Sequence, residues 1–161
     1  MDIIIREYQE EDIPSIVSIW NTVIEGANAF PQVTLLKPEE AKVSFASQSF
    51  VGVAVCEEEI LGFYLLHPNN VGRCGHIANA AYVVKKSDRG KHIGEMLVRD
   101  SLIIGHELGF QIMQFNAVVS TNSVAIHLYE KLGFQKVGII PKGFLLGDGT
   151  YTDIIIYYID L

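Results

Sequence analysis

Residues 82–97 have the sequence YVVKKSDRGKHIGEML, which is the most informative stretch for the fold. Apolar residues typical of a buried strand come first, a short polar turn follows, and the pattern then becomes that of an amphipathic helix. We predict that this helix begins at Asp88, continues for about twenty residues and ends at Gly109, because glycine is a common helix C-cap.

Charge distinguishes this turn from the rest of the chain. The turn carries four basic residues and one aspartate, whereas the whole chain has a formal net charge of −7. A helix N-terminus presents unpaired N–H groups and the positive end of the helix dipole. The stretch therefore predicts a diphosphate site, with a solvated helix cap bearing ordinary surface lysines as the alternative.

Hydrophobic periodicity predicts the elements on either side of this turn. Strands are expected at residues 3–8, 51–57, 60–67, 76–84, 112–120, 135–140 and 152–161. Further helices are expected within residues 10–28, from residue 37 onward and over residues 122–132, and a tight hairpin turn at Glu58 and Glu59. Hairpins precede a single long crossover helix, so the predicted fold class is α/β (α+β), with a mixed sheet flanked by helices.

Composition limits the classes of protein that need be considered. The 161 residues are 49% hydrophobic and 19% charged, with a mean hydropathy of +0.26, which predicts one globular domain over residues 1–161. The sequence pI near 5.1 argues against a protein that binds nucleic acid by neutralising phosphates. We expect a cytoplasmic protein without a membrane segment, because no basic leader precedes an apolar run near the ~20 residues of a membrane span.

Several kinds of site lack their usual sequence patterns. The two cysteines form no CxxC pair and the five histidines form no ligand cluster, so we predict reduced thiols and no bound metal. A phosphate-binding GxxxxGK(S/T) loop, a GxGxxG turn after a strand and a GxSxG elbow are all missing. The absence of these motifs argues against a nucleotide hydrolase, a Rossmann dehydrogenase and a serine hydrolase, respectively.

Two segments resemble motifs of a known family. Residues 89–94, Arg-Gly-Lys-His-Ile-Gly, resemble the acetyl-CoA pyrophosphate loop (Q/R)-x-x-G-x-(G/A) of the GCN5-related N-acetyltransferase (GNAT) superfamily. His92 replaces the central glycine, which removes the freedom of that residue to take positive φ. Residues 122–134 resemble the family segment N-x-x-A-x-x-x-Y-E-K-x-G-F at the family's spacing, and the sequence is identified as a member of this superfamily.

The resemblance implies a mixed, mostly antiparallel sheet in which the strand ending at Val84 and the strand over residues 112–119 splay apart. Acetyl-CoA is the implied cosubstrate, its pantetheine arm adding to the open strand edge. A free N–H near Tyr82 or Val83 would polarise the thioester carbonyl as an oxyanion donor. The implied cofactor contacts are Tyr82, Val83, Val84, Arg89, Gly90, Lys91, His92, Ile93, Gly94 and Asn122.

The resemblance also implies a catalytic acid. Tyr129 occupies the position of the family's tyrosine near the thioester sulfur, where a phenol can protonate the departing thiolate. The other interpretation of Tyr129 is a core residue with a hydroxyl group. Many members carry a glutamate here as the general base, but residues 77–84 contain no carboxylate. The amine would then lose its proton through a water relay or bind already neutral, and His76 is a candidate substitute base.

Two asparagines in otherwise apolar predicted strands, Asn79 and Asn116, are candidates for the acceptor site. Residues 67–84, 115–123 and 139–144 resemble the fungal proline-analogue (azetidine-2-carboxylate) N-acetyltransferases, and phosphinothricin-type enzymes are a more distant likeness. By this resemblance both asparagines contact a small amino acid or cyclic imino acid, although they also fit as amides bridging two core strands. Peptide or protein amine acetylation and a non-catalytic acyl-CoA-binding module are the alternatives, and a homodimer is left open.

Overall fold

The computed structural model describes residues 2–161 and is built on one seven-stranded sheet with the order β1-β2-β3-β4-β5-β7-β6. The strands are β1 (Ile3–Glu7), β2 (Phe50–Cys56), β3 (Glu59–Pro68), β4 (Ile77–Val84), β5 (Ile112–Val119), β6 (Gln135–Leu145) and β7 (Tyr151–Asp160). The helices are α1 (Ile13–Gly26), α2 (Pro38–Ala46), α3 (Ile93–Glu107) and α4 (Ser123–Lys131). Among the strands of residues 2–161, only β4 and β5 pair in parallel, which confirms the predicted mixed, mostly antiparallel sheet.

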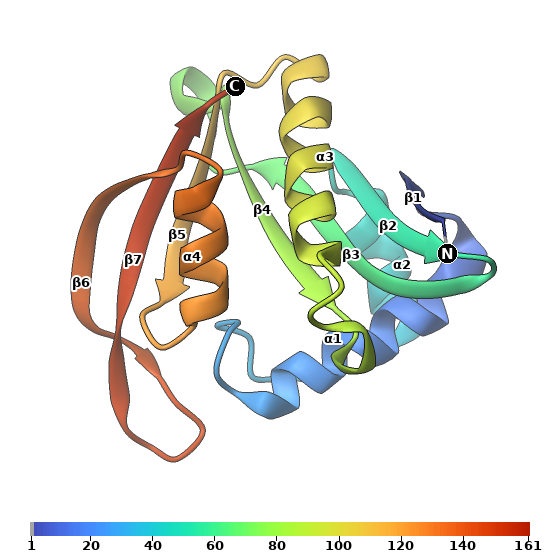
Figure 1. Ribbon diagram of the computed structural model, residues 1–161, viewed down its shortest axis with the longest axis horizontal. Helices are drawn as coiled ribbons and strands as arrows, with labels where there is room; N and C mark the ends of the chain where they lie inside the picture. Colours follow the sequence, from blue (N-terminus) through green and yellow to red (C-terminus); the bar gives the residue numbers. More distant parts are fainter. Residues whose placement is uncertain (1) are drawn as a thin grey trace.

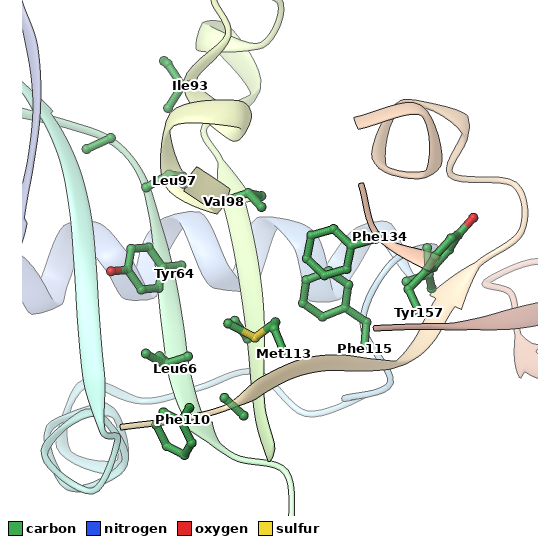
Figure 2. Packing of buried hydrophobic residues seen from close by; sticks show 14 of the residues in the cluster. Tyr64, Leu66, Ile93, Leu97, Val98, Phe110, Met113, Phe115, Phe134 and Tyr157 are labelled. Carbon is green, nitrogen blue, oxygen red and sulfur yellow. The ribbon is translucent and has the colours of Figure 1, made fainter. Parts of the chain in front are cut away.

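Helices cover both faces of the sheet, α3 and α4 on one and α1 and α2 on the other (Figure 1). Alternation along the strands divides the apolar residues between two cores. Val53 and Phe63 face α1, whereas Ala54 and Tyr64 face α3. Figure 2 shows part of the core on the α3 side. Within residues 2–161, no helix is both long and apolar enough to cross a membrane.

Strands β4 and β5 are in register only at their first residues. The paired positions are Ile77 with Ile112 and Ala78 with Met113, and just before them the N–H of Gln111 donates to the carbonyl of His76 at 2.9 Å. Beyond these positions the two strands diverge (Figure 1). This divergence, called the split below, confirms the predicted splay.

The prediction that the crossover helix begins at Asp88 is wrong. Asp88 ends a short 3-10 turn, and α3 begins only at Ile93. The Asp88 carboxylate is buried and accepts hydrogen bonds from Lys91 Nζ and Ser87 Oγ, both at 2.7 Å. These bonds hold the chain in a loop, so the helical pattern of the sequence begins five residues before the helix does.

The position of a hairpin turn and the length of β6 also differ from the predictions. The hairpin turn lies at Glu57 and Glu58, one residue early, with Glu57 in the left-handed region at φ 56°. Strand β6 extends to Leu145 rather than ending at residue 140, because a bulge with Lys142 at φ 56° interrupts its alternation without ending it. The N–H of Lys142 donates to Asp153 Oδ1 at 3.0 Å, which holds the bulge against β7.

Close packing against Tyr64 requires a glycine at position 52. A Cβ on Gly52 would lie 2.2 Å from the ring of Tyr64, which is fully buried, whereas a Cβ on Gly138 of β6 would meet nothing within 4 Å. We expect G52A to lower the free energy of unfolding by about 1–3 kcal/mol through overpacking. Urea denaturation of G52A and of the matched strand variant G138A measures this, and equal midpoints for the two would contradict it.

Candidate active site

The backbone of β4 presents free groups to the split. At one end of the strand the N–H of Lys85 donates to Leu61 of β3, and at the other the carbonyl of Ile77 accepts from Asn69. Backbone groups of alternate residues in a strand point in opposite directions, and the β3–β4 register is continuous. Odd-numbered residues of β4 therefore bond to β3, and even-numbered ones face the split.

This alternation separates the three residues predicted to contact pantetheine. The N–H and C=O groups of Tyr82 and Val84 face the split, where β5 has already diverged. The backbone of Val83 faces β3, and its side chain is buried in the core under α1. Tyr82, rather than Val83, is therefore the candidate oxyanion donor.

The loop before α3 has the shape of an anion site at a helix N-terminus. Gly90 takes φ 81° and has nothing within 4 Å of its Cβ direction, so its backbone is open to close approach. His92 takes φ 61° and precedes the first residue of α3. The histidine thus adopts the left-handed conformation that glycine favours, at a cost of about 1–2 kcal/mol.

The cations of this loop have different roles. Lys91 is tied to buried Asp88, and Lys85 forms an ion pair with Glu59 of the β2–β3 hairpin. Arg89 is exposed and forms no salt bridge with the described part of the chain. Lys86 is likewise exposed and forms no salt bridge within residues 2–161. Lys91 and Lys85 therefore shape the loop, and Arg89 and Lys86 are free to approach a phosphate.

Asn122 lies at the N-cap of α4, as its position in the motif predicts. Its Oδ1 accepts a hydrogen bond from the N–H of Ala125 at 3.3 Å. An asparagine that caps through its oxygen keeps two amide N–H donors on Nδ2. These donors are available to a cofactor that enters between α3 and α4.

Tyr129 lies in a cluster of aromatic rings beside the split. Its ring centroid is 4.6 Å from that of Phe115, 5.5 Å from Phe134, 6.1 Å from Tyr157 and 6.4 Å from Tyr82. Figure 2 shows Phe115 and Phe134 side by side, near Tyr157. Burial raises the pKa of Tyr129 well above its ordinary value, so the phenol keeps its proton at neutral pH.

The two predicted asparagines are brought together, and a third joins them. Asn69 Oδ1 accepts from Asn79 Nδ2 at 3.2 Å and from Asn116 Nδ2 at 2.7 Å. Gln114 Nε2 donates to Asn116 Oδ1 at 3.0 Å. We call Asn69, Asn79 and Asn116 the amide cluster.

Asn69 is the member that sequence reasoning missed, because it stands in the loop after β3. Its N–H bond to Ile77 brings that loop beside β4, and the turn-rich letters Pro-Asn-Asn were the only signal. Neighbours of Asn79 on β4, Ala78 and Ala80, belong to the core on the α3 side. Asn79 thus points to the opposite face of the sheet from Tyr129, at the narrow end of the split.

His76, the predicted substitute base, lies at the narrow end of the split, and its role as a base stays a prediction. His76 is exposed and precedes β4, where the two strands still pair. His67 of β3 lies directly opposite Asn79 in register, and burial lowers its pKa, which favours a neutral ring. Among residues 2–161, no group of three or more histidine, cysteine, aspartate or glutamate side chains is placed to hold a metal ion.

Comparison with known proteins identifies the class that this fold and site define. The chain matches the model of the Acetyltransferase (GNAT) family over residues 15–134 and belongs to that family. N-acetyltransferase aca1 of Schizosaccharomyces pombe is 36% identical over 121 residues, which cover 74% of this chain and 58% of that protein. The chain therefore spans less than two thirds of that relative.

Solved structures agree with this assignment. A GCN5-related N-acetyltransferase from Kribbella flavida matches with a TM-score of 0.92 at 28% identity, covering 99% of this chain and 98% of the other. A phosphinothricin acetyltransferase from Sinorhizobium meliloti in complex with AcCoA matches with a TM-score of 0.92 at 20% identity, covering 100% and 89%. The predicted superfamily and its fold are confirmed, and the predicted likenesses to a fungal N-acetyltransferase and to phosphinothricin acetyltransferases are both found.

Proposed function

We propose that this chain transfers the acetyl group of acetyl-CoA to the amine of a small amino acid or cyclic imino acid. The observation that carries the proposal is the split, with free backbone groups of Tyr82 and Val84 along one edge. An extended chain bearing amides can add to such an edge as a strand would. The loop at residues 89–94 lies where that chain's diphosphate would meet the start of α3.

The proposed chemistry follows from groups on either side of the split. A neutral amine attacks the thioester carbonyl carbon, its C–N bond forms, and the N–H of Tyr82 stabilises the developing oxyanion. Collapse breaks the C–S bond, and the departing thiolate takes a proton from the Tyr129 hydroxyl. The amine nitrogen releases its surplus proton to water, and the Tyr129 phenolate recovers one from water.

The amide cluster supports a small polar acceptor. Its internal hydrogen bonds use Asn69 Oδ1 and one N–H each of Asn79 and Asn116, which leaves Asn69 Nδ2 and Asn79 Oδ1 free within the cluster. Asn69 Nδ2 can donate to the carboxylate of an amino acid, and Asn79 Oδ1 can accept a hydrogen bond from its amine. Because all three side chains are uncharged, this recognition depends on placement rather than on net charge.

Acid catalysis by Tyr129 can be tested by removing one oxygen atom. We expect Y129F to lower kcat about a hundredfold, with little change in the Kd for CoA, because the phenol acts on the leaving thiolate. The measurement is release of free thiol from acetyl-CoA with a panel of amino and imino acids.

Y157F is the matched control for this substitution. Tyr157 belongs to the same aromatic cluster, but its hydroxyl donates to Glu130 Oε1 at 2.9 Å. We expect Y157F to keep its turnover number within about twofold. Equal rates for Y129F and the parent protein would remove Tyr129 from the mechanism.

Acceptor binding by the amide cluster gives a second test. We expect N69A, N79A and N116A each to raise the acceptor KM about tenfold, the scale of one hydrogen bond to a charged group, with KM for acetyl-CoA unchanged. N70A is the control, because Asn70 is the next residue and bonds only the N–H of Val71. A cluster variant with the same acceptor KM as N70A would contradict this assignment, and turnover with peptides alone would favour the peptide-acetylating alternative.

A further inference from the structure

The three side chains of the Tyr-Glu-Lys segment that ends α4 contact three different parts of the protein. Tyr129 enters the aromatic cluster, and Glu130 accepts a hydrogen bond from Tyr157 of β7. Lys131 Nζ donates to Glu95 Oε2 at 2.7 Å, on the first turn of α3. The proposed chemistry uses Tyr129 and gives Lys131 no task.

The bond from Lys131 to Glu95 joins the two parts of the sheet that the split separates. Helix α3 packs against β1 to β4, whereas α4 lies over β5 and β7 (Figure 1). The strands themselves share only two paired positions across the split, at its narrow end. A contact between α3 and α4 therefore restrains how far the two parts separate at the open end.

The same two helices also touch one turn away from this ion pair. A Cβ on Gly94 would lie 3.8 Å from Leu128 Cδ2, so Leu128 packs close to the last glycine of the diphosphate loop. Gly94 directly precedes Glu95, and Leu128 precedes Lys131 by three residues. The start of α3 thus lies close to Leu128 of α4 and is joined to α4 by the ion pair.

Glu95 is well suited to hold a cation across this gap. Its side chain is only 18% exposed, and the hydrogen bonds from Lys131 and, to a lesser extent, from Arg99 hold the pKa of this carboxylate below its ordinary value. Arg99 Nη2 donates to the other oxygen, Oε1, at 2.8 Å, from the next turn of α3 itself. The carboxylate therefore binds one cation within α3 and one from the far side of the split.

We propose that the Glu95–Lys131 ion pair is a clamp that sets the width of the split and thereby the affinity for the cofactor. Both are positioning residues, because they act through the spacing of α3 and α4 rather than on the reacting atoms. Without the bond, the free protein occupies wider separations, and binding must first restore the narrow one. The clamp rests on the proposed use of acetyl-CoA, but not on the identity of the acceptor.

Calorimetric titration with CoA tests the clamp. We expect K131Q and E95Q each to raise the Kd two- to fivefold, about the range expected for losing an ion pair whose lysine side chain is half exposed. E95Q is the decisive variant, because it removes a negative charge beside the diphosphate loop. If charge alone mattered, E95Q would bind CoA more tightly than the parent protein, whereas the clamp predicts weaker binding.

Arg99 provides the matched control. R99Q removes a positive charge that bonds the same carboxylate but does not cross the split, so its Kd should stay that of the parent protein. The double variant E95Q/K131Q should bind no more weakly than the weaker single variant, and K131R should retain the parent affinity. In turnover assays the KM for acetyl-CoA should rise while kcat and the acceptor KM stay constant.

Two results would overturn the clamp, and both differ from a failure of the proposed function. Tighter or unchanged CoA binding by E95Q would refute it, as would an equal loss of affinity in R99Q and K131Q. If a variant is destabilised, amide hydrogen exchange distinguishes the clamp from general unfolding. The clamp predicts that exchange in the variant speeds up at the start of α3 and in α4 but not in α1, whereas general unfolding would speed it up in all three. Absence of CoA binding by the parent protein would instead refute the cofactor itself.

Discussion

The structure depends on the divergence of two neighbouring strands that begin as an ordinary parallel pair. After Ala78 and Met113 the strands no longer bond to each other, so backbone donors and acceptors inside the sheet are left for another partner. Buried backbone groups without partners are costly, and proteins rarely leave them. An arm that carries its own amides can complete this sheet, and its length along β4 fixes where a thioester at its tip would lie.

Each side of the split supplies a different component of the proposed reaction. The aromatic cluster around Tyr129 lies under α4, where burial raises the pKa of the phenol further above its ordinary value. The amide cluster lies on the other face of the sheet, at the narrow end, and its three side chains are uncharged. An acetyl group held between the two would meet an amine from one side and lose its thiol toward the other. The ion pair between Glu95 and Lys131 joins α3 to α4 across the split.

Much of the fold and of the candidate site could be predicted, because hydrophobic periodicity and the motif residues determine them. Hydrophobic periodicity predicted the strands and the flanking helices, and the segments at residues 89–94 and 122–134 predicted the loop and the helix that flank the split. The start of α3 was not predictable, because it depends on the buried carboxylate of Asp88 and on a positive φ at His92. Asn69 was missed because only the β3–β4 pairing brings it beside Asn79 and Asn116. The orientation of the Val83 backbone likewise follows from the register of β3 and β4.

The most direct test of the account is amide hydrogen exchange along β4, measured by NMR with and without CoA. The amides of Tyr82 and Val84 face the split, so their exchange should slow at least about tenfold when the pantetheine arm binds them. The amide of Lys85 already donates to Leu61 and serves as the internal reference, with little change expected. Unchanged exchange at Tyr82 and Val84 in a protein saturated with CoA would show that the arm does not lie along this edge.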